Sequence, residues 1–275
     1  MSLEYSRLGP LATYRLCPHD PRAKALIVHG HNEHALRYQP LMTQLCAMGI
    51  EVWAFDLPNH GRSDCHPSGQ YGHIERMALL EDAVERVQAK LNQQNAELPW
   101  ILFGHSLGGL ICSKLLLSGN LSPNIALLSA PALKAPKIAT WQLILATWVS
   151  ERWPTLRAGY RSSQPVTRDT ALYRHCQNDP LVSNLGMTAR SGMEIMAAMK
   201  AVRDTSMTLN CPTLLIQGDA DKIVSPGGAI RFARQHSAVT LNQYPGGYHE
   251  LLNDLDREQV MTDIVAFLER HLPSA

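Results

Sequence analysis

The sequence has almost no net charge and no long run of basic residues. Its 275 residues include 25 Lys and Arg against 24 Asp and Glu, which leaves a formal net charge of +1. Proteins that bind nucleic acid concentrate positive charge on one surface to meet the phosphate backbone. The charge balance therefore argues against a nucleic-acid partner.

Membrane and secretion signals are also missing. No stretch approaches the ~20 consecutive apolar residues that a bilayer-spanning helix needs. The first seven residues, MSLEYSR, have neither the basic region nor the apolar region of a signal peptide. The six cysteines are scattered without CxxC spacing, which is typical of reduced thiols rather than of disulfides. These absences predict a cytoplasmic protein and leave contact with a membrane surface open.

What is present is enough apolar sequence for one large core, since 45% of the residues are hydrophobic. Strand-like and helix-like segments alternate, which predicts an α/β fold with a mostly parallel central sheet and helices on both faces. The expected strands are 11–17, 25–28, 51–56, 100–104, 125–129, 213–218 and 239–244, and the expected helices include 37–48, 77–91, 107–117 and 257–272.

The alternation breaks between Ala130 and Thr213. This stretch carries helix-like patterns and several prolines but no strong strand, and an unstructured loop of that length would be unusual in a compact domain. We therefore expect an inserted helical cap at residues 131–207, with residues 1–130 and 208–275 forming the core.

The most informative motif is Gly104-His105-Ser106-Leu107-Gly108, which lies between an apolar strand and a helix. A chain that turns this sharply has space only for small residues two positions before and after the serine, and both are glycine. The turn pushes the hydroxyl out above a helix N-terminus, which favours developing negative charge. Ser106 is therefore the candidate nucleophile.

A serine nucleophile needs a base to take its proton and an acid to orient that base. Asp219 and Asp221 follow the expected strand at 213–218, and His249 follows the strand at 239–244. The carboxyl ends of parallel strands meet at one edge of a sheet, where functional sites collect. We expect His249 to be the base and favour Asp221 over Asp219 as the acid.

These motifs resemble the monoacylglycerol lipase and lysophospholipase family of α/β hydrolases. The resemblance covers about residues 10–272 and is carried by HGxxEHxxRY from position 29, DxxxHGxS from 56, GHSLGG from 104, DPLV from 179, GxxDxIV from 218 and YHEL from 248. It implies the α/β-hydrolase fold, with Ser106 as nucleophile, Asp221 as acid and His249 as base. It also implies that monoacylglycerols or lysophospholipids are the substrates.

The loop after the strand at 25–28 is the expected site of an oxyanion hole, which needs two fixed donors where a carbonyl oxygen becomes an alkoxide. Gly30 allows the chain to turn, so we expect the donors to be the N–H groups of His31 and Leu107. Glu33 lies four residues before Arg37. It either forms a simple ion pair with Arg37 or orders the oxyanion loop beside bound substrate.

The same loop contains His29, His31 and His34, a spacing that resembles the zinc-binding run of metallo-β-lactamase-type hydrolases. A metal-dependent hydrolase of that kind needs further ligands downstream, and no comparable histidine cluster follows. It would also leave the turn at Ser106 unexplained. The metal site is therefore a minor alternative, and we expect no cofactor.

The expected cap contains an uncharged run at 138–150 with Trp141, Leu145 and Trp148 on one helical face. Three roles remain open for this face: packing on the core, lining a pocket for an acyl chain, or contacting a membrane surface. The methionines between positions 187 and 199 could adapt to a flexible chain, but their spacing favours a core face.

Together the motifs predict a serine esterase that cleaves a small-molecule acyl ester through an acyl-enzyme. A short-chain carboxylesterase or a thioesterase is the main alternative, because the same triad serves all three reactions. A binding module without activity is disfavoured by the complete triad. The sequence leaves the oligomeric state open.

Overall fold

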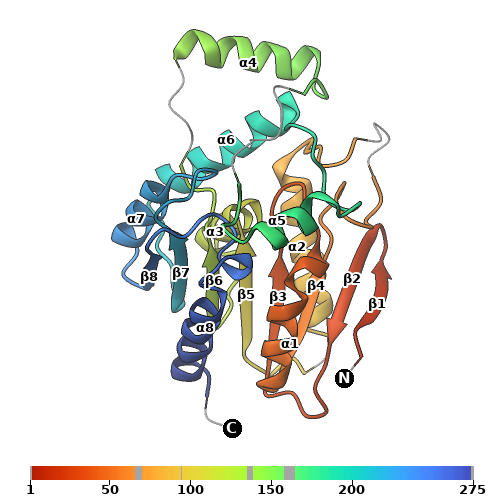
Figure 1. The fold of residues 1–275 in the computed structure, drawn as a ribbon, viewed down its shortest axis with the longest axis vertical. Coiled ribbons are helices and arrows are strands. Elements are labelled where there is room, and N and C mark those ends of the chain that lie inside the picture. The colour runs from red at the N-terminus through yellow and green to blue at the C-terminus, as the bar shows by residue number, and fades with distance from the viewer. Residues whose placement is uncertain (1, 66–69, 94, 135–138, 158–164, 274–275) are drawn as a thin grey trace.

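The computed structural model describes residues 2–65, 70–93, 95–134, 139–157 and 165–273 (Figure 1). Its strands are β1 Glu4–Leu8, β2 Leu11–Leu16, β3 Ala23–Val28, β4 Ile50–Phe55, β5 Trp100–His105, β6 Ile125–Ser129, β7 Thr213–Gly218 and β8 Val239–Tyr244. They form one sheet in the order β1-β2-β4-β3-β5-β6-β7-β8. The pairs β1–β2 and β2–β4 are antiparallel, and the other pairs are parallel.

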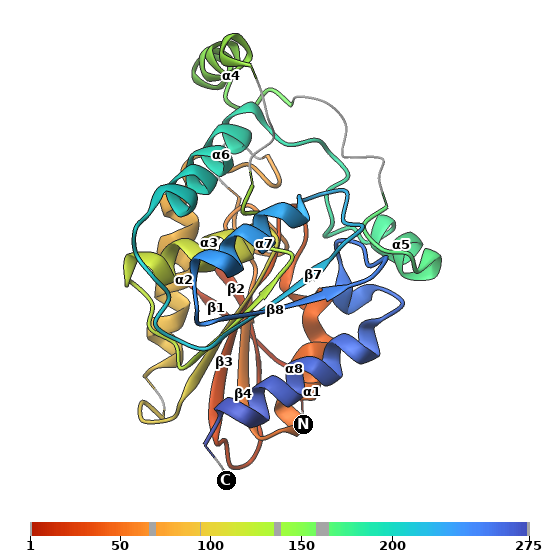
Figure 2. The ribbon, with the colours of Figure 1, turned by 90° about the vertical axis from the view of Figure 1, so that its left-hand side faces the viewer.

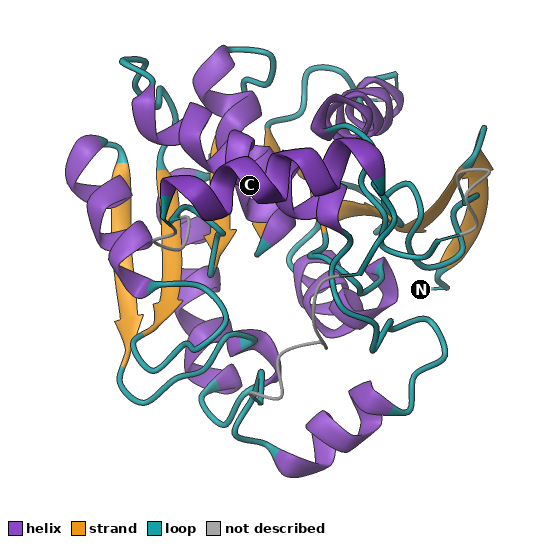
Figure 3. Cartoon of the chain, turned by 90° about the horizontal axis from the view of Figure 1, so that it is seen from above, coloured by secondary structure: helices purple, strands orange, loops and turns teal. Residues whose placement is uncertain are grey.

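Helices cover both faces of this sheet (Figure 2). One apolar cluster lies between the sheet and α2 (Met77–Leu91), α3 (Leu107–Ser118) and α7 (Pro226–Gln235). A second cluster joins the opposite face to α1 (Gln39–Ala47) and α8 (Arg257–His271). Successive residues of a strand point to opposite faces, so a central strand contributes apolar side chains to both clusters. The pair β1–β2 lies at one edge, and helices gather around the other strands (Figure 3).

The predicted α/β class and the seven predicted strands are confirmed. Sequence patterns missed β1 because its residues are mostly exposed at the sheet edge and show no apolar alternation. They gave no bounds for α7, whose first turn contains two glycines, which are poor helix formers. The helix expected at 37–48 begins as a short 3-10 turn, η1 (Ala35–Tyr38), before α1.

Between β6 and β7, the described residues form three helices: α4 (Thr140–Arg152), α5 (Thr170–Gln177) and α6 (Ala189–Asp204). Figure 1 shows α4 farthest from the sheet, with α6 between α4 and the core. The start of α6 is fixed to the core because Ser191 Oγ accepts the Ile74 N–H at 2.8 Å and Glu194 Oε2 accepts the Met77 N–H at 2.8 Å. In α4 only Ser150 is buried.

Two stretches of the expected cap, 135–138 and 158–164, are outside the described residues. The uncharged run expected at 138–150 is therefore described from residue 139 onward. In the part of the chain that the structure describes, no helix is both long and apolar enough to cross a bilayer.

Candidate active site

Ser106 lies at the turn between β5 and α3 in a strained backbone conformation. Its φ of 51° and ψ of −111° are rarely adopted by a residue with a side chain. A Cβ atom on Gly104 would lie 2.7 Å from the Gly108 carbonyl oxygen, and one on Gly108 would lie 2.2 Å from the Val28 carbonyl oxygen. The two glycines therefore allow β5, α3 and β3 to approach closely enough to hold the serine at the turn.

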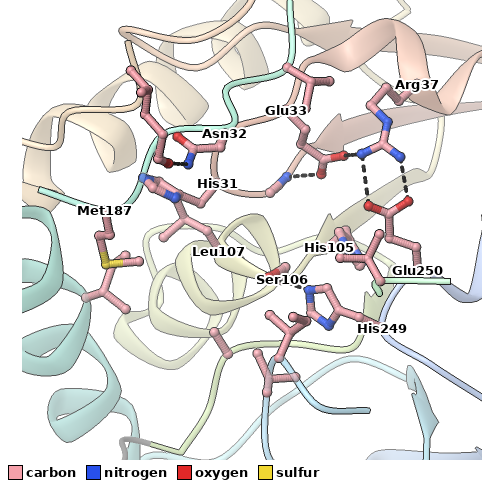
Figure 4. Close-up of a pocket in the computed structure, with 18 of the residues that line it drawn as sticks. His31, Asn32, Glu33, Arg37, His105, Ser106, Leu107, Met187, His249 and Glu250 are labelled. Carbon is pink, nitrogen blue, oxygen red and sulfur yellow. Dashed lines mark hydrogen bonds and ion pairs between the residues drawn. The ribbon is translucent and has the colours of Figure 1, made fainter. Parts of the chain in front are cut away.

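The structure brings Ser106, His249 and Asp221 into one hydrogen-bonded chain. His249 Nε2 lies 2.9 Å from Ser106 Oγ (Figure 4), and His249 Nδ1 lies 2.8 Å from Asp221 Oδ2. Asp221 follows β7 and His249 follows β8, so the ends of two paired strands position both side chains. Asp219 instead accepts the Gly246 N–H at 2.6 Å. Asp221 is thus the aspartate that contacts the histidine.

The surroundings of this pair keep Asp221 ionised and His249 basic. Burial raises the pKa of the Asp221 carboxyl, but its interactions with His249 and with two backbone N–H groups hold that pKa below the usual range. Burial lowers the pKa of His249, yet the hydrogen bond and charge of Asp221 bring it above the ordinary value of 6.5. The carboxylate therefore favours the imidazolium that forms when His249 accepts a proton.

The two N–H groups expected to form the oxyanion hole border the same space as Ser106. Leu107 is the first residue of α3, and within the described ranges neither its N–H nor that of His31 has a hydrogen-bond partner. The loop passes close to the nucleophile because position 30 is glycine: a Cβ on Gly30 would lie 3.2 Å from the Ser106 Cβ. The His31 ring is held elsewhere, with Nε2 2.8 Å from the Gly72 carbonyl oxygen.

Glu33 both orders the oxyanion loop and forms an ion pair. Its Oε1 accepts the Gly30 N–H at 2.5 Å and the Tyr38 hydroxyl at 2.7 Å, and its Oε2 accepts Arg37 Nη1–H at 2.8 Å. Burial raises the pKa of this carboxyl, but Arg37 and other nearby charges lower it to about 2. The two roles that the sequence left open for Glu33 are therefore combined in one side chain.

Glu250 completes a buried cluster that the sequence analysis missed. Arg37 donates from Nη1 to Glu250 Oε1 at 3.0 Å and from Nη2 to Glu250 Oε2. Because Glu250 directly follows His249, Arg37 connects the oxyanion loop to the loop that carries the histidine (Figure 4). In the sequence, the only indication of this contact was that Glu250 is an acidic residue next to the candidate base, because 213 positions separate Glu250 from Arg37. We call Glu33, Arg37 and Glu250 the arginine cluster.

The site opens into a pocket of about 330 Å³ that has an apolar and a polar end. The arginine cluster borders the polar end, and in Figure 4 Arg37 and Met187 lie on opposite sides of Ser106. Met187 and Met199 pack on the core, as their spacing favoured, and also line the pocket. We call the side on which Met187 lies the apolar end. The apolar lining of the pocket as a whole consists of Leu107, Ala132, Val166, Val182, Leu185, Met187, Ile195, Met199, Ile223 and Val224.

Trp141, Leu145 and Trp148 do not line this pocket, which corrects one role expected of them. Their side chains are 66%, 51% and 54% exposed. Helix α6 lies between α4 and the core (Figure 1), and it contributes Ile195 and Met199 to the pocket instead. An apolar helical face has the same sequence pattern whether a neighbouring helix covers it or leaves it exposed.

The three histidines of the metal hypothesis do not converge. His29 Nε2 accepts the Leu57 N–H at 2.9 Å, whereas His34 Nε2 lies 2.8 Å from Asp179 Oδ2 and the His31 ring contacts Gly72. No three His, Cys, Asp or Glu side chains among the described residues are grouped to hold a metal ion. The geometry therefore contradicts a zinc site built on these histidines.

We predict that Arg37→Met lowers the free energy of unfolding by about 3–5 kcal/mol at neutral pH, because it leaves two buried carboxylates without their cation. The difference in unfolding free energy between the wild type and the variant should shrink as the pH falls towards 4.5 and below. At that pH the unpaired carboxyls of Glu33 and Glu250 become neutral in the variant. Urea unfolding across this pH range measures both effects.

The matched control for that experiment is Arg203→Met. Arg203 is exposed and pairs with Asp204, so its removal should leave the unfolding midpoint unchanged. A stability of the Arg37 variant equal to that of the wild type would contradict a structural role for the arginine cluster.

The family model described as serine aminopeptidase, S33 (Hydrolase_4) matches residues 19–256. A monoacylglycerol lipase from Mycolicibacterium smegmatis is 26% identical over 259 residues, covering 92% of this chain and 90% of that protein. The monoglyceride lipase of Homo sapiens is 29% identical over 249 residues, covering 86% and 78% of the two chains.

The solved structures give the same result. The crystal structure of the monoacylglycerol lipase from Paleococcus ferrophilus superimposes with a TM-score of 0.81 at 27% identity, and the match covers 98% of this chain and 100% of that one. These comparisons confirm the resemblance and the α/β-hydrolase fold expected from the motifs. Because the family model spans most of the sequence, the chain belongs to the serine aminopeptidase S33 (Hydrolase_4) family of α/β hydrolases.

Proposed function

We propose that this protein is a serine hydrolase that cleaves the ester bond of monoacylglycerols, or of the chemically similar lysophospholipids. The observation that carries the proposal is the hydrogen-bonded chain from Ser106 through His249 to Asp221 beside a pocket with one apolar end. Relatives named monoacylglycerol or monoglyceride lipase support this substrate class.

The first half of the reaction forms an acyl-enzyme. Ser106 Oγ attacks the ester carbonyl carbon while His249 Nε2 takes the hydroxyl proton, and Asp221 stabilises the resulting imidazolium. The carbonyl oxygen becomes an alkoxide that accepts hydrogen bonds from the N–H groups of His31 and Leu107. His249 then gives its proton to the leaving alcohol as the carbon–oxygen bond breaks.

The second half releases the fatty acid. Water enters the site left by the alcohol, and His249 removes one of its protons as the water oxygen attacks the acyl carbon. The tetrahedral intermediate collapses, Ser106 Oγ leaves and recovers its proton from His249, and the enzyme returns to its starting state. Every proton passes through the one histidine, so its basicity controls both halves.

The two ends of the pocket suit the two parts of such a substrate. The acyl chain fits the apolar end, where α6 supplies Ile195 and Met199 and the adjoining loop supplies Met187. The hydroxyl-bearing alcohol then faces the polar end. The described part of the inserted segment acts as a cap in this arrangement, because Met187, Ile195 and Met199 line the pocket beside Ser106.

The family description mentions an aminopeptidase, which must bind the positively charged amino group of a peptide. Glu33 and Glu250 are the acidic residues that line the pocket, and both are paired with buried Arg37. All four carboxylate oxygens already accept hydrogen bonds from buried donors, so a substrate ammonium group would have to displace one of them. A neutral polar alcohol therefore suits this pocket better than a peptide N-terminus.

We predict that Ser106→Ala lowers hydrolysis of long-chain monoacylglycerols by at least about 10³-fold, because it removes the nucleophile. Fatty-acid release should be measured on monoacylglycerols of short, medium and long chain, on a lysophospholipid and on an acyl thioester. Ser118→Ala, an exposed serine at the end of the same helix, is the matched control and should keep full activity.

The possible results of this assay distinguish the candidate functions from one another. Activity that rises towards long monoacylglycerols and requires Ser106 supports the proposal. Preference for short esters or for the thioester would replace it by the carboxylesterase or thioesterase alternative. Full activity of the Ser106 variant would reject the triad.

We also propose that α4 contacts the lipid surface from which such substrates come. Four apolar side chains of α4 are each more than half exposed: Trp141, Ile144, Leu145 and Trp148. Exposed patches of apolar side chains are uncommon in proteins unless they bind a partner or a membrane. The charged residues of α4 are confined to its last two positions, Glu151 and Arg152. An uncharged, Trp-containing helix of this kind can enter the interface of a neutral bilayer.

Sedimentation with phosphatidylcholine vesicles tests this contact. The double variant Trp141→Ser, Ile144→Ser should lower vesicle binding about tenfold through lost apolar burial, without changing hydrolysis of a soluble short ester. Leu255→Ser, which removes an equally exposed apolar side chain before α8, should bind vesicles normally. Unchanged vesicle binding by the double variant, or loss of a dimer instead, would reject the membrane role.

A further inference from the structure

Gln217 is a fully buried polar residue near the end of β7 that the sequence patterns treated only as part of an apolar strand. Its side-chain Nε2 donates to Asp221 Oδ2 at 3.0 Å and to the Gly218 carbonyl oxygen at 3.1 Å. Asp221 Oδ2 is the same oxygen that contacts His249 Nδ1 at 2.8 Å. The amide of Gln217 therefore touches the acid of the proposed triad from the side of the sheet.

The orientation of this amide follows from its neighbours. Both a carboxylate and a backbone carbonyl can only accept hydrogen bonds, so the amide group must direct its N–H hydrogens towards Asp221 and Gly218. Its Oε1 is buried and has no partner among the described residues. Burying an unpaired carbonyl is unfavourable, and an apolar side chain of the same length would avoid that cost.

We propose that Gln217 is a positioning residue for the catalytic acid, fixing Asp221 Oδ2 in front of His249 and moderating the basicity of that histidine. This inference rests on the proposed function of the triad. The other carboxylate oxygen, Oδ1, already accepts the N–H groups of Ile223 at 2.8 Å and Val224 at 3.0 Å. The Gln217 amide supplies the remaining donor, so that neither oxygen can rotate away from its position.

The hydrogen bond has a defined electrostatic effect. A donor to Asp221 Oδ2 draws negative charge from the oxygen that stabilises the His249 imidazolium. Removing that donor leaves more charge on Oδ2, which raises the pKa of His249. The base is then protonated at a higher pH, so activity is lost at a higher pH as the solution becomes more acidic.

The other groups around His249 remain the same when only Gln217 is changed. Glu250 and Glu33 favour the protonated imidazole through their negative charge, and both are paired with Arg37. The ring of His105 lies 4.8 Å from that of His249, and burial lowers its pKa to about 4, so it is neutral where the base titrates. A shift in the pH profile would therefore report on Asp221 Oδ2.

The test compares Gln217→Met with Gln243→Met. Methionine keeps the unbranched shape of glutamine but has no donor, and Gln243 is exposed on β8 at the position paired with Gln217. The first readout is the rate at which a fluorophosphonate labels Ser106 as a function of pH, which needs the nucleophile and base but no particular acyl chain. Ester turnover and thermal unfolding are measured beside it.

We expect the acid limb of the labelling profile to move up by roughly half a pH unit in Gln217→Met. Ester kcat should fall about tenfold, the equivalent of one charge-assisted hydrogen bond, with KM nearly unchanged. The melting temperature should stay close to that of the wild type, because the loss of the bonds to Asp221 and Gly218 is offset by removal of the unpaired Oε1. Gln243→Met should match the wild type throughout, and Gln217→Asn, whose amide is too short to reach Asp221, should repeat the shift.

An acid limb that is unchanged or moves down in both Gln217 variants would overturn the inference, as would a loss of activity that merely follows a loss of stability. Labelling that is normal in the wild type without hydrolysis of any monoacylglycerol would reject the proposed substrate but leave the Gln217 comparison valid. A wild-type protein that does not label at Ser106 would overturn both.

Discussion

The ion network of Arg37 with Glu33 and Glu250 is the interaction on which the geometry of the site depends. Glu33 holds the Gly30 N–H and so sets the path of the oxyanion loop, while Glu250 belongs to the loop that carries His249. A buried ion pair gains little stability over apolar packing, but it is specific in direction and strongly unfavourable to break. The cluster therefore fixes the distance between the two loops rather than simply adding stability.

The sheet provides the second constraint. Parallel strands place the turn at Ser106, the loop after β7 and the loop after β8 at one edge, so residues distant in the sequence meet there. Above this edge, α6 is hydrogen-bonded to the core and lines the pocket, whereas α4 lies outside it with its apolar residues exposed. The inserted segment thus contains one helix that shapes the pocket and another that faces solvent.

The sequence predicted the features that depend on local pattern. The small residues around Ser106 follow from steric limits and the apolar strands from periodicity. The roles of Asp221 and His249 follow from their places after two strands and from the resemblance to α/β hydrolases. The sequence predicted the Glu33–Arg37 pair as one of two roles for Glu33, but not its link to Glu250, because a contact across 213 positions leaves no periodic signal. Nor did it predict the Gln217–Asp221 contact, which depends on how the chain turns after β7. It also did not give the orientation of α4, since periodicity shows which residues share a face but not what that face meets.

The central claim is that Ser106 forms a covalent acyl intermediate, and mass spectrometry tests it directly. The protein is mixed with a long-chain monoacylglycerol, quenched in acid within one turnover and digested. The account predicts that the peptide containing Ser106 gains the mass of the fatty acid less one water, and that Ser106→Ala protein gains none. Continued hydrolysis without an acylated Ser106 peptide, or an acyl group found on another residue, would contradict it.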